Sequence, residues 1–210
     1  MSKKKRKGLI TVIAVIFFVY YFVAARPVPR ETILTPKWIT SLEAEDPVLL
    51  GKADSKNHIF PFTLGYRFGY IDSSGQFAIN KIKTGNIDLG ENMWTEYPPE
   101  PSDIEIKNIA EETIINIENT RGYPVLLDNR IFILGSEQDS LSEIDANGNV
   151  KWSYEFASIL IDMDAAAGLV VAVSIDGIVE ILDSEGNRIY FFQPRGSRLE
   201  AICGCAISRD

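Results

Sequence analysis

Histidine and cysteine are scarce in this sequence, which holds one histidine, His58, and two cysteines, Cys203 and Cys205. A hydrolytic triad needs a base such as histidine, and no Gly-x-Ser-x-Gly nucleophile motif accompanies His58. A zinc site would need more Cys and His ligands than these. The phosphate-binding pattern Gly-x-x-x-x-Gly-Lys-Ser/Thr is also absent. We therefore expect no catalytic residue, no metal site and no cofactor, and we predict that the protein is not an enzyme.

The two cysteines lie two positions apart, in Cys203-Gly204-Cys205. On a strand their side chains would share one face, which is a poor geometry for a disulfide. We interpret them as small apolar residues on a buried strand, with an exposed thiol as the alternative. Asp162 and Asp164 have the same spacing, but a turn between blades explains them as well as a pair of catalytic carboxylates.

Basic residues are scarce beyond position 30. The first thirty residues hold seven Lys or Arg and no acid, so the remainder has 21 − 7 = 14 basic residues against 29 acidic ones, a net charge of 14 − 29 = −15. Such a surface repels phosphate backbones and excludes nucleic acid as a partner. The charge indicates either plain solubility or an acidic docking surface.

One long uncharged run is present, from Leu9 to Ala25, directly after a basic block at residues 3–7. As a helix this run would span about 25 Å, within the range of membrane-spanning helices. We predict a transmembrane signal anchor at 9–25 and a cytoplasmic basic tail at 1–8, because Lys and Arg are retained inside. The alternative is a signal peptide cleaved after Ala25. Both hypotheses place the bulk of the chain in the periplasm or otherwise outside the cytoplasm; with the anchor retained, it is a single-pass protein of the inner cell membrane.

Residues 26–56 contain prolines at positions 27, 29, 36 and 47. We therefore expect this segment to be an extended tether. From residue 57 onward, short runs rich in Ile, Val, Phe and Tyr alternate with Gly, Asn and Asp, which is typical of strands and turns. The stretch from Gly85 to Asp103 is predicted to be a loop or an insertion between blades. For Ile104 to Ile117 a short helix remains open.

Three segments repeat the pattern apolar, Asp, two variable residues, Gly, in which Asp binds the backbone two residues on and Gly takes positive φ. A further Asp-Gly pair predicts a two-residue hairpin turn. These structural turns are Asp72 and Gly75, Asp145 and Gly148, Asp183 and Gly186, and Asp176 and Gly177.

The first and second of these aspartates are 73 residues apart and the second and third 38, which indicates a period near 40 with one turn missing, expected around Asn119 to Gly122. Such a period in all-β sequence is typical of four-stranded propeller blades. We predict that residues 57–210 form a small or partial, truncated β-propeller, because they have room for about four blades at most. A β-sandwich or an open meander of hairpins is the alternative.

The run from Leu141 to Trp152 resembles the repeat of the quinoprotein-like (PQQ/WD40-like) β-propellers, in which a strand ends in an apolar-Asp pair, turns through Gly and continues to Trp. The segment from Ser174 to Asp183 resembles the hairpin of the same unit. Tyr190-Phe191-Phe192 departs from the pattern, because it replaces the expected Trp. The quinoprotein cofactor and calcium ligands have no matching positions here.

These observations together predict a membrane-tethered, extracytoplasmic propeller that acts as a non-catalytic scaffold for another envelope protein. The membrane itself is the second expected partner, through Leu9 to Ala25. The alternative function is a ligand-sensing or quinoprotein-type module that binds a small molecule in the propeller channel.

Overall fold

The computed structural model describes residues 13–21, 36–43, 58–193 and 202–208. The chain divides into two units, Met1–Lys37 and Trp38–Asp210. In the first unit, residues 13–21 form a helix with exposed apolar side chains. No helix among the described residues is both long and apolar enough to cross a membrane. The rest of the expected anchor, residues 9–12 and 22–25, and most of the expected tether lie outside the described residues.

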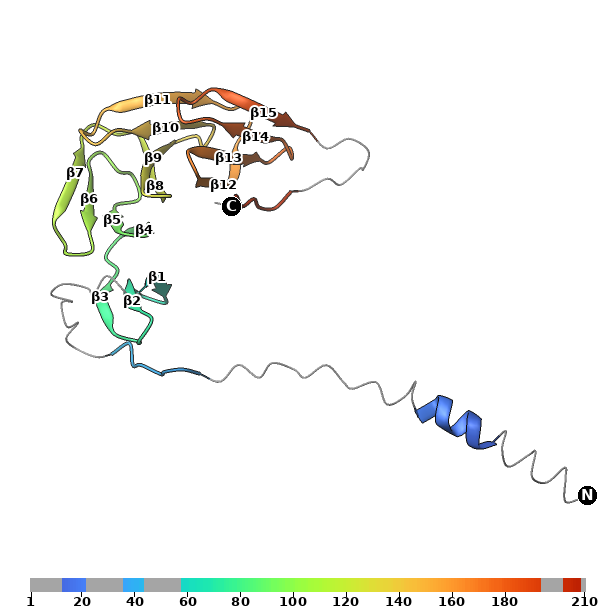
Figure 1. Ribbon diagram of the computed structural model, residues 1–210. Coiled ribbons are helices and arrows are strands. Elements are labelled where there is room, and N and C mark those ends of the chain that lie inside the picture. Colours follow the sequence, from blue (N-terminus) through green and yellow to red (C-terminus); the bar gives the residue numbers. More distant parts are fainter. Residues whose placement is uncertain (1–12, 22–35, 44–57, 194–201, 209–210) are drawn as a thin grey trace, which may run out of the picture. The chain divides into compact units, whose positions relative to one another are not determined.

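The described part of the second unit folds into fifteen strands in four antiparallel sheets, each a simple meander in chain order (Figure 1). We call these sheets the first to fourth blades. They consist of β1 (Ile59–Leu64), β2 (Arg67–Asp72) and β3 (Phe77–Ile82); β4 (Asn86–Leu89), β5 (Met93–Tyr97), β6 (Ile104–Asn108) and β7 (Thr113–Ile117); β8 (Gly122–Leu127), β9 (Arg130–Gly135), β10 (Ser140–Ile144) and β11 (Val150–Glu155); and β12 (Leu160–Ala166), β13 (Leu169–Ser174), β14 (Val179–Leu182) and β15 (Arg188–Phe192). The all-β prediction is confirmed, and so are four-stranded blades for the second to fourth sheets, whereas the first sheet has three strands among the described residues.

The hydrophobic core lies between the blades. Three apolar clusters form, one at each junction of consecutive blades, and each takes residues from both sides. Phe68 and Tyr70 of the first blade, for example, share a cluster with Trp94 of the second. The first strands of the last three blades also contact one another, β4 with β8 and β8 with β12, which makes them the innermost strands. Blade-to-blade burial is therefore what stabilises the array.

The Asp-x-x-Gly segments all join the third and outermost strands of a blade and have one geometry. Asp145 Oδ1 accepts hydrogen bonds from the backbone N of Asn147 and Asn149 at 2.8 and 2.9 Å, and Gly148 has φ +83°. The turns at Asp72 and Asp183 repeat these bonds. In the first blade this turn joins β2 to β3, so β1–β3 correspond to the second to fourth strands of the other blades.

The missing turn lies at Asn108 to Glu112, and the predicted position around Asn119 was wrong. Asn108 Oδ1 accepts from the backbone N of Glu112 at 2.9 Å, as the aspartates do at the other turns. Glu111 takes the glycine position, with φ +65°. The four turns are thus spaced by 36, 37 and 38 residues. Asn in place of Asp and Glu in place of Gly concealed this repeat in the sequence.

Two further expectations are corrected in the second blade. The stretch from Gly85 to Asp103 contains β4 and β5 and is not an inter-blade insertion; its loops are the short turn at residues 90–92 and the longer connection at 98–103. Ile104 to Ile117 forms the hairpin of β6 and β7 and not a helix. This segment forms strands because its buried residues recur every second position. Alternate isoleucines on each strand, such as Ile104 and Ile106, are buried against the third blade.

The tight turn from β12 to β13 offers a stability prediction. Exposed Ala167 has φ +51° and precedes Gly168 at φ +81°, a pair of values that favours Asn-Gly over Ala-Gly. Ala167→Asn should therefore raise the free energy of unfolding by about 1 kcal/mol, because alanine is strained in this region and asparagine tolerates it. Urea denaturation measures the change. Ala157→Asn, at an exposed alanine without positive φ, is the control; an equal gain there would contradict the turn argument.

Candidate functional site

One end of the blades carries connections that are fixed by backbone hydrogen bonds. We call this end the loop face: it comprises the connections between second and third strands (98–103, 136–139 and 175–178) and those between blades (118–121 and 156–159). Thr120 N donates to Ser102 O at 2.7 Å, and Leu160 N to Gln138 O at 2.8 Å. The loops 98–103 and 136–139 are thus each held by the connection to the next blade, and the loop 175–178 is held by the connection before its own blade through Ile175 N and Ile159 O, so backbone hydrogen bonds make this face rigid.

Three isoleucines are exposed together on the fourth-blade side of the loop face, and we call them the isoleucine patch. Ile159, Ile161 and Ile175 are 46%, 43% and 64% exposed. Ile175 N donates to Ile159 O at 2.8 Å, which fixes the two residues side by side. Exposed apolar groups on a rigid surface favour contact with another protein.

A hollow of about 670 Å³ opens on the same loop face between the second and third blades. The loop 98–103, the connection 118–121 and the start of β8 supply most of its lining. Arg121 is the one basic residue in the lining, and Glu100 is the one acidic residue. The hollow is open and of mixed polarity, a shape that suits a protruding side chain of a partner.

A second hollow, of about 400 Å³, lies on the second blade, and its polar groups already bind one another. Glu96 accepts from Thr84 Oγ1 at 2.7 Å and from Gly85 N at 2.8 Å. Burial acts to raise the pKa of Glu96, but these hydrogen bonds outweigh it and hold the pKa below its usual range. The carboxylate therefore has a structural use in its own loop and does not point to a ligand.

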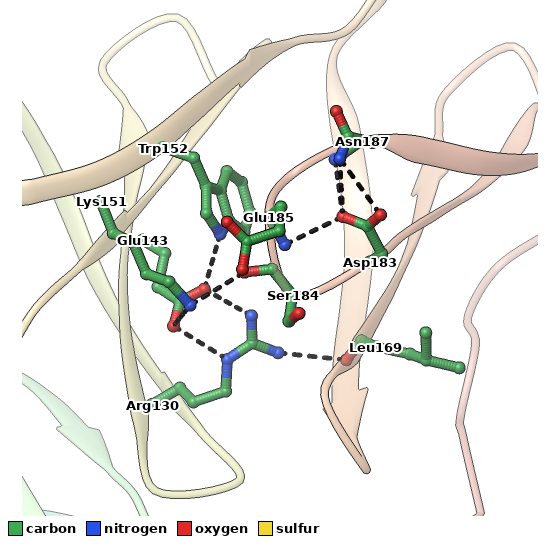
Figure 2. Close-up of polar contacts among 9 residues, drawn as sticks. All are labelled: Arg130, Glu143, Lys151, Trp152, Leu169, Asp183, Ser184, Glu185 and Asn187. Atoms are coloured by element: carbon green, nitrogen blue, oxygen red, sulfur yellow. Dashed lines mark hydrogen bonds and ion pairs between the residues drawn. The ribbon is translucent and has the colours of Figure 1, made fainter.

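The junction of the third and fourth blades centres on the buried carboxylate of Glu143 (Figure 2). Arg130 donates to it through Nε at 3.2 Å and Nη2 at 2.5 Å, and Trp152 through Nε1 at 2.7 Å. Arg130 Nη1 also reaches Leu169 O of the fourth blade at 3.3 Å. Burial acts to raise the pKa of Glu143, but Arg130 and Trp152 together hold it below its usual value.

The innermost strands are joined by a different carboxylate. Asp88 of β4 accepts a hydrogen bond from Leu126 N of β8 at 2.6 Å. Burial raises the pKa of Asp88 to about 6, although the backbone N–H groups of Leu126 and Leu89 act to lower it. The ionised form of Asp88 therefore destabilises the folded state at neutral pH.

This shift predicts a pH dependence. Between pH 4 and 7 the folded protein binds more protons at Asp88 than the unfolded chain does, so its contribution to stability falls as pH rises, by about 2 kcal/mol. Asp88→Asn cannot ionise, so the difference in unfolding free energy between this variant and the wild type should grow in the variant's favour over that range. Urea titrations at several pH values measure it. A difference that does not change with pH would contradict the prediction.

The residues singled out in the sequence do not converge on one site. Asp72, Asp145 and Asp183, with their glycines, lie at three separate outer turns, and Asp176 with Gly177 lies on the loop face in the turn from β13 to β14. His58 is exposed just before β1, where its carbonyl accepts from Ser73 N. These residues build turns and strand ends.

Two local interpretations were wrong. Asp162 and Asp164 lie within the innermost strand β12 and not in a turn, and their carboxylates accept from Cys205 N and Ile207 N at 2.8 and 2.9 Å. Cys203 is exposed and Cys205 half-buried, so the pair is not on a buried strand. Burial and the two aspartates raise the pKa of Cys205 to about 11, which keeps that thiol protonated.

The isoleucine patch and the carboxylate of Asp88, which receives the Leu126 N–H, were missed by the sequence analysis, since neither has a local motif. Among the described residues, no group of three His, Cys, Asp or Glu side chains is placed to hold a metal ion.

Consecutive four-stranded antiparallel blades, packed through their faces with the first strands innermost, define a β-propeller fold. A family model described as beta-propeller protein matches residues 1–210, and the chain belongs to that family. A protein of Treponema pallidum (strain Nichols), described as uncharacterized, is 27% identical over 218 residues. The match covers 100% of this chain and 57% of that protein, so the chain spans little more than half the length of this relative.

Two solved structures share the fold. The structure titled "KlHsv2 with loop 6CD replaced by a Gly-Ser linker" gives a TM-score of 0.54 at 11% identity, over 72% of this chain and 56% of that one. Kluyveromyces lactis Hsv2 gives a TM-score of 0.50 at 8% identity, over 67% and 56%. At such identities the likeness concerns the fold alone.

Proposed function

We propose that this protein is a membrane-tethered, extracytoplasmic β-propeller that acts as a non-catalytic scaffold for another envelope protein. The observation that carries the proposal is the isoleucine patch, because it is apolar, exposed and fixed by backbone bonds on a rigid face. Ordered loops lose little conformational entropy when they bind, so such a surface suits a specific partner.

The charge around the patch favours a partner of complementary sign. Asp176 follows Ile175 in the sequence, and Glu137 and Asp139 flank Gln138, whose carbonyl accepts a hydrogen bond from Leu160 N, next to Ile159 and Ile161. A partner with an apolar centre and a basic rim matches this arrangement, since rim charges steer association and select partners. The net charge of −15 after residue 30 also favours a basic partner.

The tether is supported by the sequence of residues 1–25, in which an uncharged run follows a basic block. We expect the chain to stay with the membrane on carbonate extraction, and to be digested when protease is added from outside to spheroplasts. Deletion of residues 9–25 should leave it inside the cell. Protection of the full-length chain from protease would refute the outward placement.

The isoleucine patch has a direct test. Ile175→Glu should lower capture of the envelope partner at least tenfold, because a charge is placed in an apolar contact. Val150→Glu is the matched control, since Val150 is 60% exposed but lies on the outer strand β11. Cross-linked proteins from detergent-solubilised envelopes are compared among wild type and both variants. If every captured protein is kept by Ile175→Glu, the scaffold role of this face is lost.

The alternative, a quinoprotein-type module, gives a different result in the same material. The resemblance of Leu141 to Trp152 to the quinoprotein repeat supports it. A quinone cofactor with calcium should then raise the melting temperature, whereas a scaffold should show no change. A clear rise without any partner captured at the isoleucine patch would favour the ligand-binding function.

A further inference from the structure

The hollow between the second and third blades has walls that hydrogen bonds to the backbone hold in place. On one side, Asn119 N donates to Asp103 Oδ1 at 3.1 Å. On the other side, Gln138 N donates to Gly135 O at 2.8 Å and closes the turn that carries Ser136. The shape of the hollow is thus determined by the fold.

Arg121 lines this hollow and is exposed, and its guanidinium has no hydrogen-bond or ion-pair partner among the described residues. The other three arginines of the described blades all donate to a side chain: Arg67 to Asn80, Arg130 to Glu143 and Arg188 to Glu180. A guanidinium stays charged at physiological pH and presents five donors in a planar fork. Arg121 is therefore free to bind an acceptor from outside the described chain.

Glu100, the acidic residue of the lining, does not pair with Arg121, since no ion pair joins the two across the part of the chain that the structure describes. The side chains of Ser102, Asn119 and Ser136 also line the hollow and form no hydrogen bond within that same part. The smaller hollow on the second blade is different, because its carboxylate already binds its own loop. The polar groups around Arg121 are thus available to a ligand.

The lining also limits the kind of group that fits. The volume of about 670 Å³ is large for an inorganic anion, and Glu100 disfavours a group with several negative charges. Pro101 and half-buried Tyr123 bring rings to a lining that is otherwise small and polar. A single carboxylate on a short aliphatic stem suits this arrangement, because it matches the guanidinium fork and its methylene groups pack on rings.

The hollow and the isoleucine patch lie on one continuous surface. The loop 136–139 lines the hollow through Ser136, and Gln138 O of the same loop accepts from Leu160 N, next to the patch. A protein seated on the patch therefore has the hollow within its reach. Arg121 offers an acidic side chain a match on a face that otherwise favours basic ones.

We infer that the hollow receives an Asp or Glu side chain of the envelope partner, with Arg121 as the residue that binds its carboxylate. The inference rests on the proposed scaffold function, because that function places the partner on the loop face. The partner then carries an acidic residue within its basic rim. Such a charge match at one position determines the register in which the two proteins dock.

Direct binding tests the hollow in the absence of the partner. The full-length chain with ¹⁵N-labelled arginine is titrated in detergent micelles with N-acetyl-glutamate amide, and the Nε–H signal of Arg121 is identified by its loss in Arg121→Gln. This signal should move to saturation, about threefold further than the other arginine signals, whereas N-acetyl-glutamine amide should not move it. Equal shifts with the two amides, or equal shifts of all arginines, would overturn the inference.

The charge of the entering group is tested with the same cross-linked envelope material as for Ile175→Glu. Arg121→Gln should lower capture of the partner about tenfold, and Glu100→Gln should raise it about twofold, because Glu100 repels an entering carboxylate. Lys83→Gln is the matched control. It removes the same charge from a side chain that also has no partner among the described residues, in the connection between the first and second blades, and should leave capture unchanged.

Ile175→Glu separates a failure of this inference from a failure of the scaffold role. Loss of capture with Ile175→Glu but not with Arg121→Gln would show a partner that does not use the hollow, and would overturn the inference alone. A gain with Arg121→Gln and a loss with Glu100→Gln would show that a basic group enters, and would overturn it as well. If Ile175→Glu also leaves capture unchanged, the scaffold role itself is lost.

Discussion

Arg130→Met is expected to lower the free energy of unfolding by about 3 kcal/mol, because it leaves the carboxylate of Glu143 buried without its main counter-charge. Both side chains of this pair are shielded, at 14% and 8% exposure. Methionine keeps the aliphatic packing of the arginine stem, so the loss reports the charge. Urea denaturation at pH 7 measures it.

Two variants show whether the buried charge is the cause. Lys81→Met breaks the ion pair with Glu111, in which the side chains are 38% and 37% exposed, and should cost at most about 1 kcal/mol. Adding Glu143→Gln to Arg130→Met should restore more than half of the loss, since glutamine is neutral and still accepts from Trp152 Nε1. A double variant no more stable than Arg130→Met would contradict this explanation.

The pH dependence of the loss caused by Arg130→Met tests the same explanation, because the direction of its change follows from the pKa of Glu143. In the wild type, Arg130 and Trp152 keep the pKa of Glu143 low, so their stabilisation is present at neutral pH and is lost as pH falls through that low pKa. Without Arg130, burial dominates and the pKa of Glu143 rises. The penalty of Arg130→Met should therefore shrink as pH is lowered from 7 toward 4, as Glu143 takes up a proton in the folded state.

The sequence could predict the blades because their turns are local. Asp145 and Gly148 determine a hairpin through bonds within five residues, and the flanking strands show their period directly. The turn at Asn108 was not predicted because Glu111 holds positive φ without being glycine. Lys81, thirty residues earlier on the neighbouring blade, binds the Glu111 carboxylate and helps to hold Glu111 in this conformation. Contacts of that range have no local pattern.

The candidate interaction surface could not be predicted for a related reason. Ile159, Ile161 and Ile175 look in the sequence like ordinary strand residues, and their exposure depends on where β12 and β13 pair and on the bulge after Leu160. The same alternation buries Leu160 and Val173. Only the register decides which apolar residues face outward.

Gly186→Ala should lower the free energy of unfolding by about 3 kcal/mol, the sum of backbone strain and a steric clash. Gly186 has φ +78°, and an added Cβ would lie 2.6 Å from Cδ2 of Trp152. The ring cannot easily move away, because it is buried and its Nε1 is bound to Glu143 at 2.7 Å. Urea denaturation again gives the loss.

Gly168→Ala separates the two causes. Gly168 has nearly the same φ, +81°, but the nearest atom to an added Cβ is Ser184 Cβ at 4.0 Å, which is ordinary contact. This variant should lose only about 1 kcal/mol, the cost of the strained backbone. In a Trp152→Leu background, Gly186→Ala should likewise cost about 1 kcal/mol, because the clashing ring is gone. If Gly186→Ala costs as much without the ring as with it, packing of the turn against the preceding blade is not what requires glycine there.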